Sequence, residues 1–215
     1  MSLRAAFSQI PRPLLLPALV ALAIVLLSAC TSMPTAQVSD WQSHQASLTA
    51  MQQWILRGRL NIRQNRQSET VNLSWQQTPQ EFSIRMSGAL GLGAVNLSGN
   101  QSGVTLERSG EETVFLPDLD ALSHDYLGYD FPAAYLLYWV RGLPALGLQA
   151  SNTTNDQNLL QTLIQTDTSG QRWDLAFESY QAVDTLILPK RIKMQSQGVQ
   201  LTFLIDKWQL TASEL

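Results

Sequence analysis

The fold is set by residues Trp54–Met86, which read WILRGRLNIRQNRQSETVNLSWQQTPQEFSIRM. Apolar residues such as Leu60 and Ile62 alternate there with arginine, asparagine and other polar residues. A period of two is typical of strands that bury only one face. Short polar turns at Asn65–Ser68 and Thr78–Gln80 interrupt the alternation, and turns of this length join antiparallel strands rather than parallel ones. The segment therefore predicts three antiparallel strands in a sheet with one apolar and one polar face.

The same alternation returns after residue 94 and predicts further strands. Gly170 and Gly198 lie in polar pairs that mark hairpin turns. Pro189 has no backbone N–H to donate to a sheet, so it favours the start of a strand or an edge strand. The apolar positions of these strands are Val95 and Leu97; Val104 and Leu106; Val114 and Leu116; those within Asn158–Thr166; Trp173, Leu175 and Phe177; Leu186 to Leu188; Ile192 and Met194; and Val199, Leu201, Phe203 and Ile205.

Three segments have helical character. Ser39 or Asp40 can accept hydrogen bonds from free backbone N–H groups and start a helix that runs to about residue 54. A second helix is expected over residues 117–128, where a proline helps to start it. A third is expected over residues 132–142. It is apolar on almost every side, so we expect the concave side of the sheet to enclose it.

About eleven antiparallel strands with inserted helices predict a mainly β protein. Each strand twists against its neighbour, so a sheet of this size curls. The expected result is a barrel or an open half-barrel with apolar residues on the inside. The length suits one such domain with a substantial core.

The N-terminus has the pattern of a secretory signal peptide. Arg4 and Arg12 precede the apolar run Leu14–Cys30, LLLPALVALAIVLLSAC. Leu27–Cys30 resembles a lipobox, in which the signal is cut before the cysteine and the cysteine receives acyl chains. Cys30 is the only cysteine of the chain, so it has no disulfide partner within the chain.

The alternative is an uncleaved transmembrane helix with an incidental cysteine. Pro17 interrupts the apolar run, and no Lys or Arg follows it until Arg57, whereas a stop-transfer helix has basic residues on its cytoplasmic side. We therefore expect a signal peptide at residues 1–29, an acylated tether at residues 30–39 and a folded domain at residues 40–215. Several acyl chains anchor a protein firmly, whereas one chain alone holds it only marginally.

The charge balance argues against some partners. Removing Arg4 and Arg12 from the 14 basic residues leaves 12 against 17 acidic ones, a net charge of −5 for the mature chain. This balance disfavours binding to nucleic acid, or to an anionic membrane surface, through bulk charge. Only 14% of the residues are charged, while Gln, Ser, Thr and Asn are abundant, which is typical of a weakly charged globular domain.

No group of residues predicts catalysis. His44 and His124 are the only histidines, and neither lies in a metal-binding spacing. The sequence has no nucleophile elbow and no glycine-rich phosphate loop. The acidic residues between positions 118 and 125 flank a predicted helix, where they stabilise its start. We therefore expect no catalytic residues, no metal and no cofactor, and no enzymatic activity.

One loop is unusually apolar. Residues 87–94 read SGALGLGA, with three glycines, two leucines and no charge. A leucine at a loop tip costs up to roughly 2 kcal/mol relative to burial. Leu90 and Leu92 are therefore either exposed for a purpose or folded back onto the core, and Leu92 can also belong to the next strand.

Several short motifs follow one another in a fixed order after the lipobox: Trp54-x-x-x-Gly58-x-Leu60, Leu73–Trp75, Ala89–Gly91, Trp139–Pro144, Leu188-Pro189-x-x-Ile192 and Trp208. In this order and spacing the mature chain resembles the LolB family of outer-membrane lipoprotein receptors. The resemblance implies an unclosed antiparallel β-barrel of about eleven strands with helices covering an apolar cavity. The same fold is implied for the periplasmic carrier LolA.

The resemblance also implies a role. A receptor of this family accepts acylated lipoproteins from LolA and releases them into the lipid of the outer membrane. It is anchored there through its N-terminal cysteine and faces the periplasm. Thr31 agrees with that location, because it is not the aspartate that retains such proteins in the inner membrane. A monomer is expected, and no nucleic acid partner.

The family's protruding loop carries an exposed leucine used in release. Leu90 is the matching position, but the second leucine, Leu92, leaves open which of the two has this role. Apolar residues that can line the acyl-chain cavity are Leu73, Trp75, Phe82, Ile84, Met86, Leu97, Leu106, Tyr138, Trp139, Leu175 and Phe177. Each of them can also be ordinary core packing. The alternative function is a structural or scaffold lipoprotein of the cell envelope with a filled core.

Overall fold

The computed structural model describes residues 38–64, 66–88, 93–122 and 133–210. These residues belong to one compact unit, Ala36–Leu215. The predictions made for the signal peptide, Cys30, Leu90 and Leu92 lie outside the described residues. None of the helices in the described ranges is long and apolar enough to cross a membrane.

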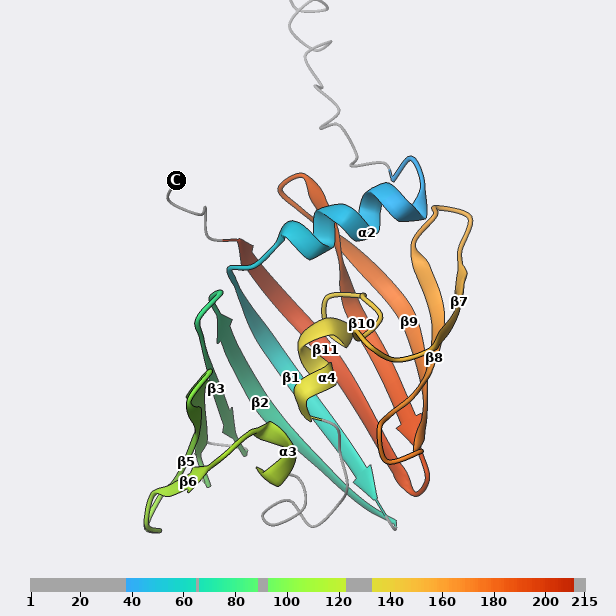
Figure 1. Ribbon diagram of the computed structural model, residues 1–215. Coiled ribbons are helices and arrows are strands. Elements are labelled where there is room, and N and C mark those ends of the chain that lie inside the picture. The colour runs from blue at the N-terminus through green and yellow to red at the C-terminus, as the bar shows by residue number, and fades with distance from the viewer. Residues whose placement is uncertain (1–37, 65, 89–92, 123–132, 211–215) are drawn as a thin grey trace, which may run out of the picture. The chain divides into compact units, whose positions relative to one another are not determined.

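The described strands form one antiparallel sheet of 11 strands, in the order β6-β5-β4-β3-β2-β1-β11-β10-β9-β8-β7 (Figure 1). Within the described part of the chain, β6 and β7 end the sheet without pairing with each other, so the predicted unclosed antiparallel sheet is confirmed. The strands are β1 (Trp54–Gln64), β2 (Gln67–Gln77), β3 (Glu81–Ser87), β4 (Val95–Asn100), β5 (Gly103–Arg108), β6 (Val114–Leu116), β7 (Ala150–Thr154), β8 (Leu160–Thr166), β9 (Arg172–Val183), β10 (Leu186–Ser196) and β11 (Val199–Leu210).

Strand register places the apolar residues on one face. Leu73 of β2 lies opposite Met86 of β3, and the alternation that the sequence shows continues from strand to strand. The core on this face contains a group of indoles: the rings of Trp54 and Trp75 are 5.1 Å apart, and those of Trp54 and Trp208 are 5.3 Å apart. Such aromatic pairs add to the stabilisation that comes from area burial alone.

A bulge between β1 and β11 explains the glycine of the Trp-x-x-x-Gly motif. Arg57 pairs with Lys207, but the next residue, Gly58, pairs with Ile205, so Asp206 is the extra residue. A Cβ atom on Gly58 would lie 2.1 Å from the backbone oxygen of Leu204. Only glycine fits this close approach of two strands.

Helix α2 (Trp41–Ala50) begins as the sequence predicts. The Asp40 carboxylate accepts hydrogen bonds from the backbone N–H and the hydroxyl of Ser43, both over 2.8 Å, and these bonds lower the pKa of Asp40. The predicted end near Trp54 is wrong. Trp54 is the first residue of β1, where it pairs with Gln77, and this sheet pairing overrides the helical pattern.

Helix α4 spans Ala133–Trp139. The chain turns out of the helix at the expected glycine, Gly142, which has a φ of 81°. The N–H of Leu143 donates to the carbonyl of Tyr138 over 3.1 Å, and the N–H of Gly142 donates to that of Trp139 over 3.0 Å. These bonds form a Schellman motif. Helix α3 (Leu119–Leu122) covers only the start of the predicted helix at 117–128, and residues 123–132 lie outside the described ranges.

Two expectations for the second half of the sheet were wrong or incomplete. Pro189 is neither at the start of a strand nor on an edge strand: it lies inside β10, which is between β9 and β11. The β9–β10 register shifts between Pro189 and Arg191, and a bulge of this kind tolerates a residue without an N–H. Strand β7 has no counterpart in the sequence-based prediction, because its residues are all exposed and show no apolar alternation.

Candidate functional site

The inward face of the sheet brings all the predicted cavity residues together. Register places those of β2 to β5 on one face. Those of β9 and α4 pack on the same side of the sheet, in the larger of its two apolar clusters. Seven are buried and four are half-buried. The buried ones are Leu73, Trp75, Leu97, Leu106, Trp139, Leu175 and Phe177, and the half-buried ones are Phe82, Ile84, Met86 and Tyr138.

On the β1–β4 half of this face, burial decreases along the strands. On β1, Trp54 and Leu56 are 1% and 0% exposed and Leu60 is 6% exposed, whereas Ile62 is only half-buried. On β2 and β4 the residues nearest the same end, Val71 and Val95, are also half-buried. Helix α2 lies across the opposite end of the sheet (Figure 1). The apolar interior is therefore closed under α2, and at the opposite end it is more open beside β1–β4, whereas Trp173, Met194 and Leu201 keep the β9–β11 side closed.

The buried residues form two separate apolar clusters. The larger one lies between β1, β2, β8–β11 and the helices α2 and α4, and the smaller one comprises Leu97, Val104, Leu106 and Leu116. Ile84 and Met86 pack against both clusters but are fully buried in neither. The seam between the clusters is therefore lined by apolar side chains that retain contact with solvent.

Phe82 lies at the other end of β3, against an open pocket of about 570 Å³. Its ring packs on the backbone of Gly99, where a Cβ atom would lie 2.6 Å from two ring carbons. The pocket is also lined by polar residues of both faces, among them Glu81 and Asn100. This mixed lining distinguishes it from the apolar seam.

Helix α4 lies over the middle of the sheet (Figure 1) and is held there by a buried amide. Gln165 of β8 is 1% exposed, and its Oε1 accepts hydrogen bonds from the indole N–H of Trp139 over 2.7 Å and the backbone N–H of Ala145 over 2.8 Å. Its Nε2 donates to the carbonyl of Ala145 over 3.0 Å. One side chain thus fixes both α4 and the chain that follows it.

Arg141 joins the two helices. Its guanidinium donates to the carbonyls of Leu137 over 2.9 Å, Met51 over 3.0 Å and Leu48 over 3.4 Å, so it binds the C-terminal ends of both α4 and α2. Carbonyls at helix ends favour a cation. Its carbon Cζ lies 5.6 Å from the ring centre of Tyr138. Burial lowers the pKa of Arg141, and Tyr138 opposes this shift.

A known protein family matches the greater part of the chain. The family model described as "Outer membrane lipoprotein LolB" matches residues 52–208, which include β1 and nearly all of β11. The chain belongs to the LolB family. The family match covers both sheet edges, α4 and the seam between the two apolar clusters.

Curated LolB proteins are similar along most of their length. The "Outer-membrane lipoprotein LolB" of Pseudomonas aeruginosa strain PAO1 is 31% identical over 198 residues, which cover 89% of this chain and 94% of the relative. The protein of the same name from Stutzerimonas stutzeri strain A1501 is 32% identical over 169 residues, 79% of this chain and 80% of the relative.

Solved structures show the same fold as this LolB-family chain at low sequence identity. A LolA superfamily protein from Nitrosomonas europaea aligns with a TM-score of 0.54 at 8% identity, over 81% of this chain and 95% of that chain. A lipoprotein-sorting protein domain from Vibrio parahaemolyticus aligns with a TM-score of 0.52 at 10% identity, over 80% of this chain and 91% of that chain.

Sequence reasoning missed the two polar residues that position the helices of this LolB-family chain. Gln165 has a weak signal, because it shares the strand phase of the buried Leu163 and a glutamine in that phase needs buried partners. Arg141 has none, because its partners Leu48 and Met51 are 93 and 90 residues away along the chain.

Two buried polar atoms of the LolB-family domain, His44 Nε2 and Trp54 Nε1, have no hydrogen-bond partner among the described residues. Burial lowers the pKa of His44, and a hydrogen bond with the backbone of Ile187 opposes this shift. No group of three or more His, Cys, Asp or Glu side chains suited to a metal was found within the described ranges. The absence of catalytic activity and of a metal stays a prediction.

Proposed function

We propose that this chain is the outer-membrane receptor that accepts acylated lipoproteins from the periplasmic carrier LolA and inserts them into the outer membrane. The observation that carries the proposal is the inward face of the unclosed sheet. Its lining is mainly apolar, and residues such as Ile84, Met86 and Tyr138 stay half-buried.

Physical chemistry explains why such a face suits this task. Each exposed CH₂ group of an acyl chain costs about 0.8 kcal/mol in water, so transfer needs a continuous apolar route from carrier to receptor to bilayer. The route needs no catalytic group and no cofactor. Methionine and leucine adapt their rotamers to an irregular ligand, and Met86 lies at the seam where a guest chain would enter.

We further propose that the residues predicted as cavity lining divide into two groups. The half-buried residues Phe82, Ile84, Met86 and Tyr138 contact acyl chains. The fully buried ones, among them Trp139 and Leu175, mainly hold the sheet and helices in place, because a side chain without exposed surface needs a rearrangement before it can touch a ligand.

The membrane attachment belongs to the same proposal. Residues 1–29 are a signal peptide, Cys30 is acylated, residues 30–39 are the tether and residues 40–215 are the receptor domain. The protein is then a monomer on the periplasmic face of the outer membrane. The name "outer-membrane lipoprotein" that the curated relatives carry supports this location. Leu90 or Leu92 enters the acyl region of the bilayer during release.

The alternative, a scaffold lipoprotein with a filled core, is not favoured. A filled core buries its apolar residues completely, whereas the inward side chains near residues 62, 71, 86 and 95 keep part of their surface exposed.

A transfer assay tests the receptor function. Purified LolA loaded with an acylated lipoprotein is mixed with the mature chain in which Cys30 is replaced by alanine, and the distribution of the lipoprotein is measured after separation. Transfer to this chain is expected. A matched variant, Met86→Glu, places a charge on the apolar seam and is expected to lower transfer, whereas Ser83→Glu, at an exposed outward position of the same strand, is not. A lipoprotein that stays entirely on LolA would refute the receptor function.

A further inference from the structure

The outward face of the central strands is strongly basic, although the mature chain is acidic. Positions out of phase with the buried residues of β1, β2, β3, β10 and β11 point to this face. Among the described residues of these strands, seven such positions are basic and two, Glu81 and Asp206, are acidic. The basic residues are Arg57, Arg59, Arg63, Arg85, Arg191, Lys193 and Lys207.

Three of these residues form a row across the sheet, the basic row, which consists of Arg57, Arg85 and Lys207. Lys207 of β11 lies directly opposite Arg57 of β1. Arg57 lies opposite Ser74 of β2, and Ser74 lies opposite Arg85 of β3. Neighbouring strands are about 4.8 Å apart, so the row spans roughly 14 Å.

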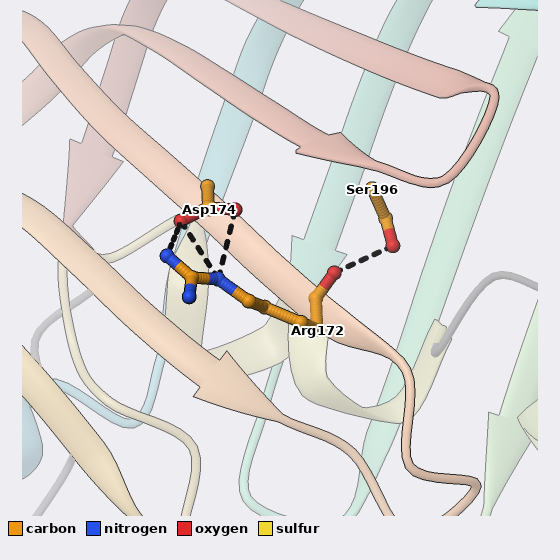
Figure 2. Close-up of polar contacts among 3 residues, drawn as sticks. All are labelled: Arg172, Asp174 and Ser196. Carbon is orange, nitrogen blue, oxygen red and sulfur yellow. Dashed lines mark hydrogen bonds and ion pairs between the residues drawn. The ribbon is translucent and has the colours of Figure 1, made fainter.

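Among the residues that the structure describes, the basic row has no acidic partner, in contrast to its surroundings. Arg172 binds both carboxylate oxygens of Asp174 on the same strand, with a shortest distance of 2.7 Å (Figure 2). Arg191 pairs with Glu178, and Arg59 lies 3.6 Å from Asp206. No ion pair or side-chain hydrogen bond of the row's three residues was found within the described parts of the chain, and all three are exposed.

This arrangement costs stability. Like charges directly opposite each other on neighbouring strands repel, and Arg57 and Lys207 are such a pair. The short polar residues beside them, such as Ser74, provide no counter-charge. An unpartnered row of cations is explained more readily by an external anion than by folding.

We infer that the basic row is a docking surface for phospholipid headgroups with a net negative charge, which it contacts at their phosphate oxygens. Guanidinium groups bind phosphate oxygens in a bidentate manner, and ammonium groups bind them as point charges. A protein partner is less favoured, because protein interfaces have an apolar, aromatic centre. The large exposed apolar residues of the described chain, Phe115 and Leu146, lie on other segments.

The net charge of the mature chain does not oppose this inference. Charges interact over about 8 Å at physiological ionic strength, so headgroups in contact with the row respond to local charge and not to the total. The inference rests on the proposed anchoring at Cys30, since a tether of ten residues spans at most about 35 Å and keeps the domain close to the bilayer.

Vesicle binding tests the basic row. The full mature chain with Cys30→Ala is sedimented with vesicles of phosphatidylethanolamine alone or of an equimolar mixture with phosphatidylglycerol. Each basic residue near an anionic surface strengthens binding roughly fivefold. The triple variant Arg57→Gln/Arg85→Gln/Lys207→Gln is therefore expected to lose on the order of 100-fold in affinity for the mixed vesicles.

A matched control removes the same charge elsewhere. The triple variant Arg66→Gln/Arg108→Gln/Arg172→Gln changes the net charge equally but leaves the row intact, and it is expected to bind mixed vesicles nearly as well as the parent. Exchange of lysine and arginine within the row (Arg57→Lys/Arg85→Lys/Lys207→Arg) is expected to preserve binding. Thermal unfolding of each variant checks that the fold is unchanged.

Three results would overturn the inference. Equal losses in the two glutamine triples would indicate bulk charge, and equal binding to both vesicle types would exclude recognition of headgroups with a net negative charge. Unchanged binding of the row's glutamine triple to the mixed vesicles would show that the row does not bind headgroups. Because the assay uses neither LolA nor a lipoprotein, its failure leaves the transfer assay of the receptor function unaffected.

Discussion

Trp139 of α4 donates its indole N–H to Oε1 of Gln165 on β8, over 2.7 Å and 26 residues of chain. Both side chains are buried, so water does not replace the bond when it is lost. The same amide group holds both backbone groups of Ala145. A single glutamine thus determines where the helix over the inward face sits.

Replacing this glutamine should destabilise the domain. Gln165→Leu leaves the N–H of Trp139 and both groups of Ala145 buried without partners, which costs about 3 kcal/mol. Urea unfolding measures the loss. Gln161→Leu, at an exposed position of the same strand, is the control and should change stability by no more than about 0.5 kcal/mol. Equal stability of Gln165→Leu and the parent would show that the bonds do not hold α4.

Arg141→Met should loosen the junction of α2 and α4. Methionine keeps an apolar side chain of similar length but donates nothing to the carbonyls of Leu137, Leu48 and Met51, so a loss of about 2–3 kcal/mol is expected. Hydrogen exchange should become faster in both helices. The exposed Arg66→Met serves as control. Exchange that accelerates equally in both variants would contradict the role given to Arg141.

Gly58→Ala should be more damaging than Gly99→Ala. The new Cβ at position 58 would meet the backbone oxygen of Leu204, which cannot move without breaking the sheet, and a cost above about 3 kcal/mol is expected. At position 99 the nearest atoms belong to the ring of Phe82, which can turn aside, and the backbone oxygen of Gly103 is farther away, at 3.0 Å. Similar unfolding midpoints for the two variants would mean that the β1–β11 bulge adapts to a side chain.

His44 should make stability depend on pH. Burial lowers its pKa in the folded protein, so the unfolded chain binds the proton more readily. Its contribution is therefore complete above the unfolded pKa of about 6.5 and is lost as the pH falls through the lower folded value. His44→Phe should flatten the stability profile below about pH 6.5. If urea unfolding shows that the stability of His44→Phe falls with pH as steeply as that of the parent, other groups cause the pH dependence.

Leu90→Glu should leave the acceptance of lipoproteins intact and impair their delivery to membranes, because a charge enters the acyl region only at high cost. Incorporation of a labelled lipoprotein into vesicles measures delivery. Leu92→Glu, tested in parallel, identifies which leucine carries the role. Full delivery by both variants would contradict a role of Leu90 and Leu92 in release and would favour the alternative that they only pack onto the core.

The fold was predictable wherever one face of a strand is buried, because burial imposes alternation on the sequence. Leu73 and Trp75 therefore revealed β2 directly. Strand β7 shows the limit of this signal: Ala150–Thr154 is exposed on both faces, and only its pairing with β8 makes it a strand. Pro189 misled for a related reason, since the bulge that accommodates it is a property of two strands together.

Strand phase predicted which side chains share the inward face, but not how deeply each of them is buried; that these residues hold acyl chains stays a prediction. Phase alone placed Ile84 and Leu97 on the inward face, opposite each other. It did not reveal that Leu97 is fully buried whereas Ile84 is only half-buried, because the depth of burial depends on which residues of other segments pack over each side chain. The hydrogen bonds of Gln165 and Arg141 join segments distant in sequence, and no local pattern marks such partners.

The unpaired margins of the sheet have a mechanical consequence. In the described chain no ladder connects β6 to β7, so these two strands can move apart without breaking any backbone hydrogen bond. A closed cylinder has a circumference fixed by its bonds, whereas a twisted ribbon can bend elastically. We expect such a sheet to adjust to acyl chains that occupy different volumes. One receptor can then accept lipoproteins whose acyl chains differ in number and length.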